Sequence, residues 1–380
     1  MSDPDEELRQ SIIALVARLL ETLDMLGSIA RRLHPPALKS VVATLGNRPA
    51  MLREARETLA AAAWPEQPIW FRDQIGIAVD ATLRACDGLQ EAVGSADGLR
   101  IAYRALRHVS HAMEALYPMV QILPPVSCFF LDTARRRDQA LLDRLAVAAA
   151  RPNPQTGILH ADNETDQRGG FSMYVPEDYD PARAYPVVMA LHGGSGHGRL
   201  FLWNWVSEVR GRDVILVTPT AVGETWSLME PQVDNANIAR VLERVGQQWH
   251  IDRTRLLLTG MSDGGTFTLL SGLDVASPFT HLAPVAASSH PLLLTMAEPQ
   301  RVTGLPVYLV HGVLDWMFPV STARTARDAL AAAGAKVVYR EIADLSHTYP
   351  RDENSGMLDW FLGRDRKPDG AQGATGSLAR

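Results

Sequence analysis

Cysteine is scarce in this chain, which carries only Cys86 and Cys128. Two separated thiols cannot form the disulfide framework of a small secreted domain, and neither has a second ligand at the spacing of a zinc site. Free thiols are typical of a reducing compartment. We therefore expect a cytoplasmic protein without a metal site.

Long hydrophobic runs are also missing. The most apolar stretch near the N-terminus, residues 12–26, is interrupted by Arg18, Glu21 and Asp24, and it is too short to span a bilayer. The acidic residues at positions 3–7 have the wrong sign for the first part of a secretory signal. The sequence therefore predicts a chain with no membrane span and no export signal.

No block of basic residues stands out either. Lysine and arginine number 37 and aspartate and glutamate 43, which gives a net charge of −6. This mild acidity argues against nucleic acid as a partner. The 46% of apolar and 21% of charged residues are ordinary for a soluble protein, and 380 residues suffice for two domains, each with its own core.

The first 150 residues carry a helical pattern. Apolar residues recur there at steps of three and four, which places them on one helical face: Leu8, Ile12, Leu15, Leu19, Leu23 and Leu26. Further helices are predicted over 36–63, 68–93, 99–123 and 130–149. Residues 1–150 are therefore expected to form an all-helical N-terminal domain. Its role is left open between a lid over a site and a scaffold for homo-oligomers or partners.

The spacing of apolar residues changes in the second half of the chain. Residues 151–170 are rich in Pro, Asn, Asp and Gly and are predicted to be a linker. From 171 to 363, short apolar runs alternate with helical stretches, which is typical of a doubly wound, mostly parallel α/β sheet. The runs are 171–175, 186–191, 214–218, 255–259, 281–287, 307–310 and 337–342. Residues 364–380 have little to bury and are predicted to be a disordered tail.

Residues 260–264, Gly-Met-Ser-Asp-Gly, form the sharpest motif in the chain. A G-x-S-x-G sequence between a buried strand and a helix is typical of a nucleophile elbow, where a strained turn exposes the serine. The apolar run 255–259 leads into the motif, and a helical stretch follows it. Small residues beside the serine let the backbone turn so tightly. The context predicts Ser262 as a nucleophile.

A nucleophile of this kind needs backbone N–H donors for the negative charge that develops on the substrate oxygen. One donor is expected from Asp263, and the others from Gly193 and Gly194 in the glycine-rich loop after an apolar run. The loop lacks the Lys-Ser/Thr pair of a phosphate-binding loop. A metal site at His192 and His197 lacks a third ligand nearby, so no metal is predicted there.

The partners of the serine should follow in the order acid, then histidine. Asp315 follows the late run 307–310, and His347 follows the run 337–342. His347 is expected to take the proton of Ser262 and to pass it to the leaving alcohol, while Asp315 orients the imidazole.

Other acids and histidines compete for these roles. Asp344 precedes His347 in the same loop and is expected to shape that turn instead. His290 and His311 lie in the same half, but His311 stands at the very end of its strand, too early for the base. The order and location of Asp315 and His347 favour them over these rivals.

Two further residues are predicted to bind substrate. His192 begins the glycine-rich loop, and Trp226 follows the run 214–218, where it is placed to line the acyl or alcohol pocket. The alternative for Trp226 is an ordinary core position. For the Asp263 side chain, the alternative role is a helix cap.

Residues 171–363 resemble the bacterial esterases of the α/β-hydrolase superfamily, in particular the phospholipase/carboxylesterase and polyhydroxybutyrate-depolymerase-like group. The resemblance rests on the segments 191–194, 260–265, 311–319 and 346–347. It implies hydrolysis of a small or medium carboxylic ester through an acyl-enzyme, with no cofactor.

One departure from the family pattern concerns the residue after the nucleophile. Members more often carry Gln or Asn where this chain has Asp263.

Many depolymerase-like relatives are secreted, and the expected lack of an export signal here argues against a solid extracellular polymer as substrate. Three functions are therefore weighed: an esterase, a thioesterase or peptidase with the same three residues, and a partner-binding protein that acts through its helical half.

Overall fold

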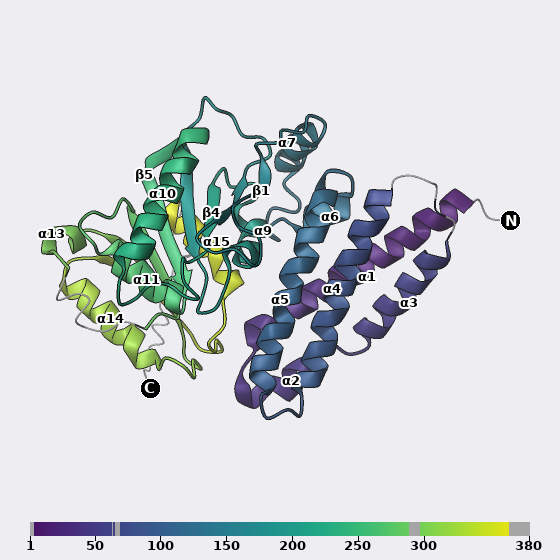
Figure 1. Cartoon of the computed structure of the whole chain (residues 1–380), viewed down its shortest axis with the longest axis horizontal. Helices are drawn as coiled ribbons and strands as arrows, with labels where there is room; N and C mark the ends of the chain where they lie inside the picture. The colour runs from purple at the N-terminus through teal and green to yellow at the C-terminus, as the bar shows by residue number, and fades with distance from the viewer. Residues whose placement is uncertain (1–3, 63, 65–68, 289–296, 365–380) are drawn as a thin grey trace, which may run out of the picture.

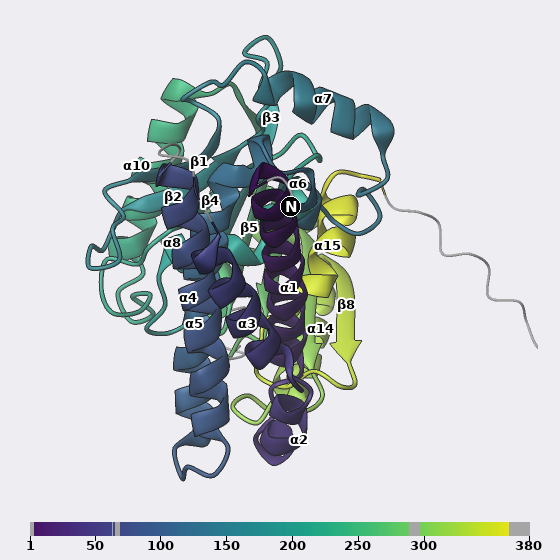
Figure 2. The same cartoon turned by 90° about the vertical axis from the view of Figure 1, so that its right-hand side faces the viewer.

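The computed structural model describes residues 4–62, 64, 69–288 and 297–364. The predictions made for residues 365–380, for His290 and for the start of the helix at residue 68 lie outside the described residues. Figure 1 shows long helices side by side along one flank of an α/β half. Figure 2 views that flank, with α1, α4 and α5 in front of the sheet.

Apart from a short helix over residues 124–129 that was not predicted, the helical half follows the predicted pattern with two differences. The long helices are α1 (Pro4–Arg32), α3 (Arg48–Ala61), α4 (Ile69–Ala92), α5 (Gly98–Leu116) and α7 (Gln139–Ala149). The shorter ones are η1 (Pro35–Ala37), α2 (Leu38–Ala43), η2 (Tyr117–Gln121) and α6 (Pro124–Phe129).

The first difference is a break in the helix predicted over 36–63. The chain turns at residues 44–47, where Gly46 adopts φ +55, so two helices replace one. The second is the late start of α7, predicted at residue 130. Asp138 begins it, because its side chain accepts a hydrogen bond from the Leu141 backbone N–H at 3.1 Å. Both predictions were wrong in extent, since local turn chemistry overrode apolar periodicity.

The described residues of the second half form an eight-stranded sheet in the order β1-β2-β4-β3-β5-β6-β7-β8. Its strands are β1 (Gly157–Ala161), β2 (Phe171–Val175), β3 (Tyr185–Leu191), β4 (Ile215–Pro219), β5 (Ile251–Met261), β6 (His281–Val285), β7 (Pro306–Gly312) and β8 (Lys336–Ile342). All neighbours from β4 to β8 are parallel, whereas β2 pairs antiparallel with both β1 and β4. The prediction of a mostly parallel α/β sheet after a helical region is confirmed.

Helices connect and cover these strands. They are α8 (Gly198–Phe201), η3 (Leu202–Asn204), α9 (Val206–Val209), α10 (Gln232–Gln248), α11 (Asp263–Gly272), α13 (Pro299–Val302), α14 (Val320–Ala332), η4 (Arg351–Glu353) and α15 (Asn354–Phe361). One strand was missed, because β1 lies inside the segment predicted as a linker. Its five residues pair with β2 at the edge of the sheet, where one partner strand suffices.

Alternate residues of the central strand β3 face two different cores. Val188 and Ala190 belong to a core shared with the N-terminal helices, whereas Val187 and Met189 belong to the core under α10. Because side chains alternate along a strand, a fully buried strand serves both faces of the sheet. The helical half therefore packs directly on one face of the sheet, and the two halves share apolar contacts.

A buried polar cluster also joins the halves. The Glu177 carboxylate accepts hydrogen bonds from the hydroxyls of Tyr117 and Tyr174 and pairs with Arg210 at 2.7 Å. Arg210 in turn donates to the Ser127 carbonyl at 2.7 Å. Burial raises the pKa of Glu177, but the Arg210 charge and the tyrosine hydroxyls outweigh it and lower the pKa.

None of the helices in the described residues combines the length and hydropathy needed to cross a bilayer.

Candidate active site

Ser262 lies on the turn between β5 and α11. Its backbone has φ 57 and ψ −118, a conformation that L-residues rarely adopt, so the turn holds the serine under strain. Neighbouring residues leave no room for side chains: a Cβ at Gly264 would collide with the His192 carbonyl oxygen. This is the strand–turn–helix arrangement that the G-x-S-x-G motif predicts.

The structure brings Ser262, His347 and Asp315 together from three separate loops. His347 follows β8, and its Nε2 lies 3.1 Å from the Ser262 Oγ. Asp315 follows β7, and its Oδ2 lies 2.9 Å from the His347 Nδ1. All three side chains are nearly inaccessible to solvent. The pairing of Nδ1 with a carboxylate leaves Nε2 free to accept the serine proton.

Asp315 is held as a charged group. Burial raises its pKa, but hydrogen bonds from His347 and from the Phe318 backbone N–H outweigh this and lower the pKa. Its other oxygen, Oδ1, accepts from the backbone N–H groups of Met317 at 2.9 Å and Phe318 at 2.8 Å. These bonds fix the orientation of the carboxylate toward His347.

The rival residues have other partners. Asp344 is largely exposed and pairs with Arg31 at 3.2 Å. His311 is fully buried, with its Nε2 2.9 Å from the Phe318 carbonyl oxygen and 3.5 Å from the Asp315 Oδ2. Neither has a hydrogen bond to the serine among the described residues.

Backbone N–H groups are available beside the serine. Among the described residues, no acceptor is paired with the N–H of Gly193, Gly194 or Asp263. The glycine loop also approaches the serine closely, since a Cβ at Gly193 would lie 3.6 Å from the Ser262 Cβ. The Asp263 carboxylate accepts from the Thr225 hydroxyl at 2.6 Å, and the N-cap position of α11 is held by Ser262 and not by Asp263. The capping alternative for this side chain was therefore wrong.

The polar groups of His192 and Trp226 are both hydrogen-bonded within the protein. The His192 Nδ1 lies 2.7 Å from the Gly193 carbonyl oxygen, and its Nε2 accepts the Ala221 N–H at 3.1 Å. Burial lowers the pKa of His192 to about 3, so the ring stays neutral. Trp226 is buried, donates to the His192 carbonyl at 2.7 Å and stacks on Phe267. The pocket-lining prediction for Trp226 was wrong, because the indole supports the loop from the core side.

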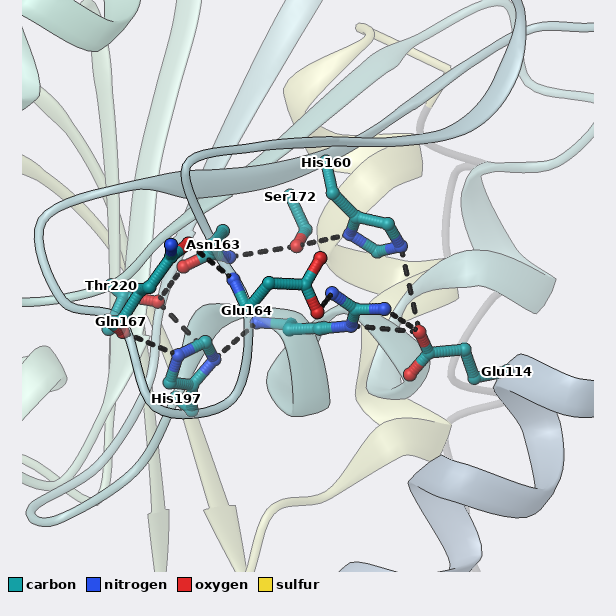
Figure 3. A network of polar contacts seen from close by, with 9 residues as sticks. Glu114, His160, Asn163, Glu164, Gln167, Ser172, His197 and Thr220 are labelled. Carbon is teal, nitrogen blue, oxygen red and sulfur yellow. Dashed lines mark hydrogen bonds and ion pairs between the residues drawn. The ribbon is translucent and has the colours of Figure 1, made fainter.

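His197 belongs to a polar network that Figure 3 shows at the junction of the halves. Its Nε2 lies 2.9 Å from the Gln167 carbonyl oxygen, and its Nδ1 accepts the Arg199 backbone N–H at 3.2 Å. The Arg199 side chain pairs with Glu114 of α5 and with Glu164. No group of three His, Cys, Asp or Glu side chains placed to hold a metal occurs in the described part of the chain. The network instead anchors the end of the glycine loop to the helical half.

A cavity of about 590 Å³ opens above the serine. The α/β half lines it with Ser262, His347 and the glycine loop. The opposite wall comes from two N-terminal helices, with residues such as Leu26 and Ala30 of α1 and Leu106, Val109 and Met113 of α5. The helical half therefore forms one wall of this cavity.

Residues of the helical half also hold the loop that carries His347. The Tyr103 hydroxyl of α5 donates to the His347 carbonyl oxygen at 2.7 Å. His34 lies 3.1 Å from the Ser346 hydroxyl, and the Thr348 hydroxyl donates to a carbonyl of α1 at 3.1 Å. Sequence reasoning missed these residues. Tyr103 and His347 are 244 positions apart, and no local motif links them.

Residues 228–361 match the sequence model of the family described as Phospholipase/Carboxylesterase. This segment includes the Ser262 turn, the Asp315 loop and the His347 loop. Together with the strand order, the match confirms the predicted α/β-hydrolase fold and the resemblance to esterases of this group.

Curated relatives are distant. A bifunctional acetylxylan esterase/xylanase from Neocallimastix patriciarum is 23% identical over 163 residues, which are 40% of this chain and 23% of that protein. Dipeptidyl-peptidase 5 from Aspergillus oryzae is 22% identical over 228 residues, which are 49% of this chain and 31% of that protein. The chain thus spans less than a third of the length of these relatives.

Among solved structures, a truncated carbohydrate esterase from gut microbiota is similar with a TM-score of 0.47 and 12% identity, over 56% of this chain and 98% of that one. A ferulic acid esterase has a TM-score of 0.46 and 16% identity, over 55% and 98%.

Proposed function

We propose that this chain hydrolyses small or medium carboxylic esters through an acyl-enzyme on Ser262. The observation that carries the proposal is the position of His347, hydrogen-bonded to the Ser262 Oγ at 3.1 Å and to Asp315 at 2.9 Å. A buried base between a strained serine and an oriented carboxylate is the arrangement that activates a hydroxyl at neutral pH.

The first half of the reaction forms the acyl-enzyme. The Ser262 Oγ attacks the ester carbonyl carbon while its proton moves to the His347 Nε2. The carbonyl oxygen becomes negatively charged and is stabilised by the N–H of Asp263 and of Gly193 or Gly194. Each donor contributes about 3 kcal/mol of barrier lowering. The carbon–oxygen bond to the alcohol then breaks, and His347 gives its proton to the departing oxygen.

The second half returns the serine. A water molecule gives a proton to His347 and attacks the acyl carbon, and collapse of the second tetrahedral intermediate releases the acid and reprotonates Ser262. Asp315 stays charged throughout, since its hydrogen bonds lower its pKa. Its charge stabilises the imidazolium that forms in each half-reaction.

The walls of the cavity suit an apolar group next to the scissile carbonyl. Leu106, Val109 and Met113 of α5 face the serine across the cavity. Because apolar walls favour burial of methylene groups, short to medium acyl chains are the expected substrates. The roof formed by α1 and α5 argues against direct action on a polymer surface.

The same residues are suited to thioesters and amides, and one curated relative is described as a dipeptidyl-peptidase. Matched ester, thioester and amide substrates with one acyl group separate these reactions through kcat/KM. A ratio that favours the ester is expected. A ratio that favours the amide would make this chain a peptidase instead.

Hydrolysis of p-nitrophenyl acetate, butyrate and octanoate by the wild type and by Ser262→Ala tests the proposal. Turnover should fall on the order of a million-fold in the variant, because the nucleophile is lost. A thermal melt of both proteins checks that the variant is folded. Wild-type turnover that survives the substitution, or a folded wild type inactive on all three esters and on the matched thioester, would contradict the mechanism.

A further inference from the structure

A second hollow of about 520 Å³ adjoins the catalytic cavity. It lies between α5 and the loop that follows β7, and it shares Tyr103, Arg107 and Met317 with the catalytic cavity. The two spaces therefore lie side by side next to Ser262 and His347, close enough for parts of one substrate to contact both.

The α5 side of the hollow is strongly cationic. Arg100, Arg104 and Arg107 follow one another along one helical face and line it. Arg100 pairs with Asp97 at 2.7 Å, whereas no carboxylate among the described residues pairs with Arg104 or Arg107. This cluster stands out in a chain whose net charge is −6.

Arg107 reaches the catalytic loop itself. One of its terminal nitrogens donates to the Ser195 carbonyl at 3.2 Å. Ser195 directly follows Gly193 and Gly194 in the glycine-rich loop beside Ser262. A guanidinium carries five N–H donors, so this single bond leaves most of them for a ligand. Planar guanidinium groups match carboxylate and phosphate oxygens in geometry and charge.

The opposite side of the hollow is apolar. Trp316 and Met317 are each 47% exposed, in a loop that also exposes Val313 and Leu314. Exposed large apolar side chains beside a reactive centre are typical of ligand contacts. The indole offers a flat face to an aromatic or otherwise planar group.

The position of Trp316 indicates which part of the ester would occupy the hollow. Its ring lies edge-on to that of His347, with the centroids 6.4 Å apart. His347 must protonate the departing oxygen, so the alcohol portion of the substrate lies on the His347 side of the scissile bond. The hollow is therefore on the leaving-group side.

We propose that this hollow is a binding subsite for the alcohol portion of the ester, and that it selects alcohols that combine a planar apolar body with a carboxylate or phosphate group. This inference rests on the proposed ester hydrolysis. Arg104 and Arg107 bind the anionic group, while Trp316 and Met317 contact the planar body.

The test compares 3-acetoxybenzoate with 3-acetoxybenzamide, which share the acetyl group and differ in the charge of the alcohol portion. After division by the rates with hydroxide alone, kcat/KM should favour the anion by about 10-fold, the size expected for two partly exposed charge pairs. The double variant Arg104→Gln, Arg107→Gln should bring this ratio close to one. Arg84→Gln, an exposed arginine of α4 outside both cavities, should leave it unchanged.

Two further arms identify the recognised feature. The preference in kcat/KM for the anionic over the neutral ester should persist when 3-acetoxyphenyl phosphate replaces 3-acetoxybenzoate. This preference should shrink as salt is raised from 0.02 to 0.5 M, since ions screen exposed charges. Monomethyl glutarate, whose charge lies on the acyl portion, should show no loss in the double variant relative to dimethyl glutarate. An anionic preference that survives the double substitution, or that follows the acyl portion instead, would overturn the proposal.

A binding measurement separates this inference from the proposed function. Titration of 3-hydroxybenzoate into Ser262→Ala, followed by calorimetry, needs no turnover. Binding that weakens about 10-fold in the triple variant Ser262→Ala, Arg104→Gln, Arg107→Gln supports the subsite even if no ester is hydrolysed. If neutral esters are hydrolysed in a Ser262-dependent manner but 3-hydroxybenzoate does not bind detectably, the proposed ester hydrolysis is supported and the proposed subsite is rejected.

Discussion

The two halves of this chain contribute to one site in different ways. The α/β half supplies the proposed reacting groups, at the ends of β5, β7 and β8. The helical half supplies the opposite wall of the cavity and the hydrogen bond from Tyr103 to the His347 loop. Reactive groups need a rigid scaffold with defined strand ends, whereas a wall needs only side chains that face the cavity.

The comparison also concerns stability. The halves share an apolar core, and the buried Glu177–Arg210 pair of the α/β half is hydrogen-bonded to Tyr117 and Ser127 of the helical half. The helical half is therefore a structural part of the protein body and not a loosely tethered module. Substitutions in either half are therefore expected to affect the site, but by different routes. Five predictions test this division, from the largest effect to the smallest.

Substitution in the α/β half, at a proposed catalytic residue, should cause the largest loss of activity. Asp315→Asn is expected to lower kcat by about 10⁴-fold, because an amide at this position holds the wrong imidazole tautomer. The matched variant Asp344→Asn alters the neighbouring acid, which is exposed and paired with Arg31, and should cost less than about five-fold. Initial rates on p-nitrophenyl acetate give both values. Equal losses in the two variants would mean that the acid has been misassigned.

The contact between the halves should dominate stability. Glu177→Gln leaves Arg210 buried without a compensating charge, and we expect a loss of about 3–5 kcal/mol in the free energy of unfolding. Urea unfolding followed by circular dichroism measures this loss. Glu243→Gln removes the exposed pair with Arg253 and should cost less than about 1 kcal/mol. A small effect of both would show that the Glu177–Arg210 pair contributes little to the stability of the contact between the halves.

The same carboxylate predicts a pH dependence. The pKa of Glu177 is lowered in the folded protein from its ordinary value of 4.5. Its contribution to stability is therefore fully present above pH 4.5 and is lost as the pH falls toward the folded pKa. Between pH 6 and 3.5, the wild type should lose more stability than Glu177→Gln. Parallel losses in both proteins would assign the acid sensitivity to other carboxylates.

The wall formed by α5 should set the acyl preference. Leu106→Trp narrows the cavity opposite Ser262, so kcat/KM for p-nitrophenyl octanoate should fall by on the order of 10-fold, while that for the acetate changes little. Ile77→Trp adds the same bulk on α4 at an exposed position outside the cavity and serves as the control. An unchanged ratio of octanoate to acetate would place the acyl group elsewhere.

The smallest effect concerns the support of His347. Tyr103→Phe removes one hydrogen bond to the His347 carbonyl and should lower kcat about five-fold with little change in KM. Tyr179→Phe removes a similar bond, from the His250 N–H, far from the cavity, and should leave kcat as it is. Steady-state kinetics with a thermal melt separates positioning from stability. A change in KM alone would make Tyr103 a substrate contact instead of a positioning residue.

The local motifs allowed much of the α/β half to be predicted. The Ser262 turn depends on the residues just before and after it, and chain order located Asp315 and His347 without any knowledge of distance. The pocket-lining prediction for Trp226 was wrong, because the sequence does not say which space an apolar residue faces. The single helix predicted over 36–63 was wrong, because a periodic run of apolar residues does not show where a turn interrupts it. The edge strand β1 was missed because five residues with one partner strand give a weak pattern.

The sequence by itself determined the strand–turn–helix around Ser262, the alternating α/β elements and the helical first half, since each depends on residues close together in the chain. Only the tertiary structure decided that α1 and α5 roof the cavity, that Tyr103 supports His347, and that Arg104 and Arg107 face Trp316. These contacts join residues that lie far apart in the sequence, 244 positions in the case of Tyr103 and His347. Their geometry follows from how the helical face packs on the sheet, which no local pattern encodes.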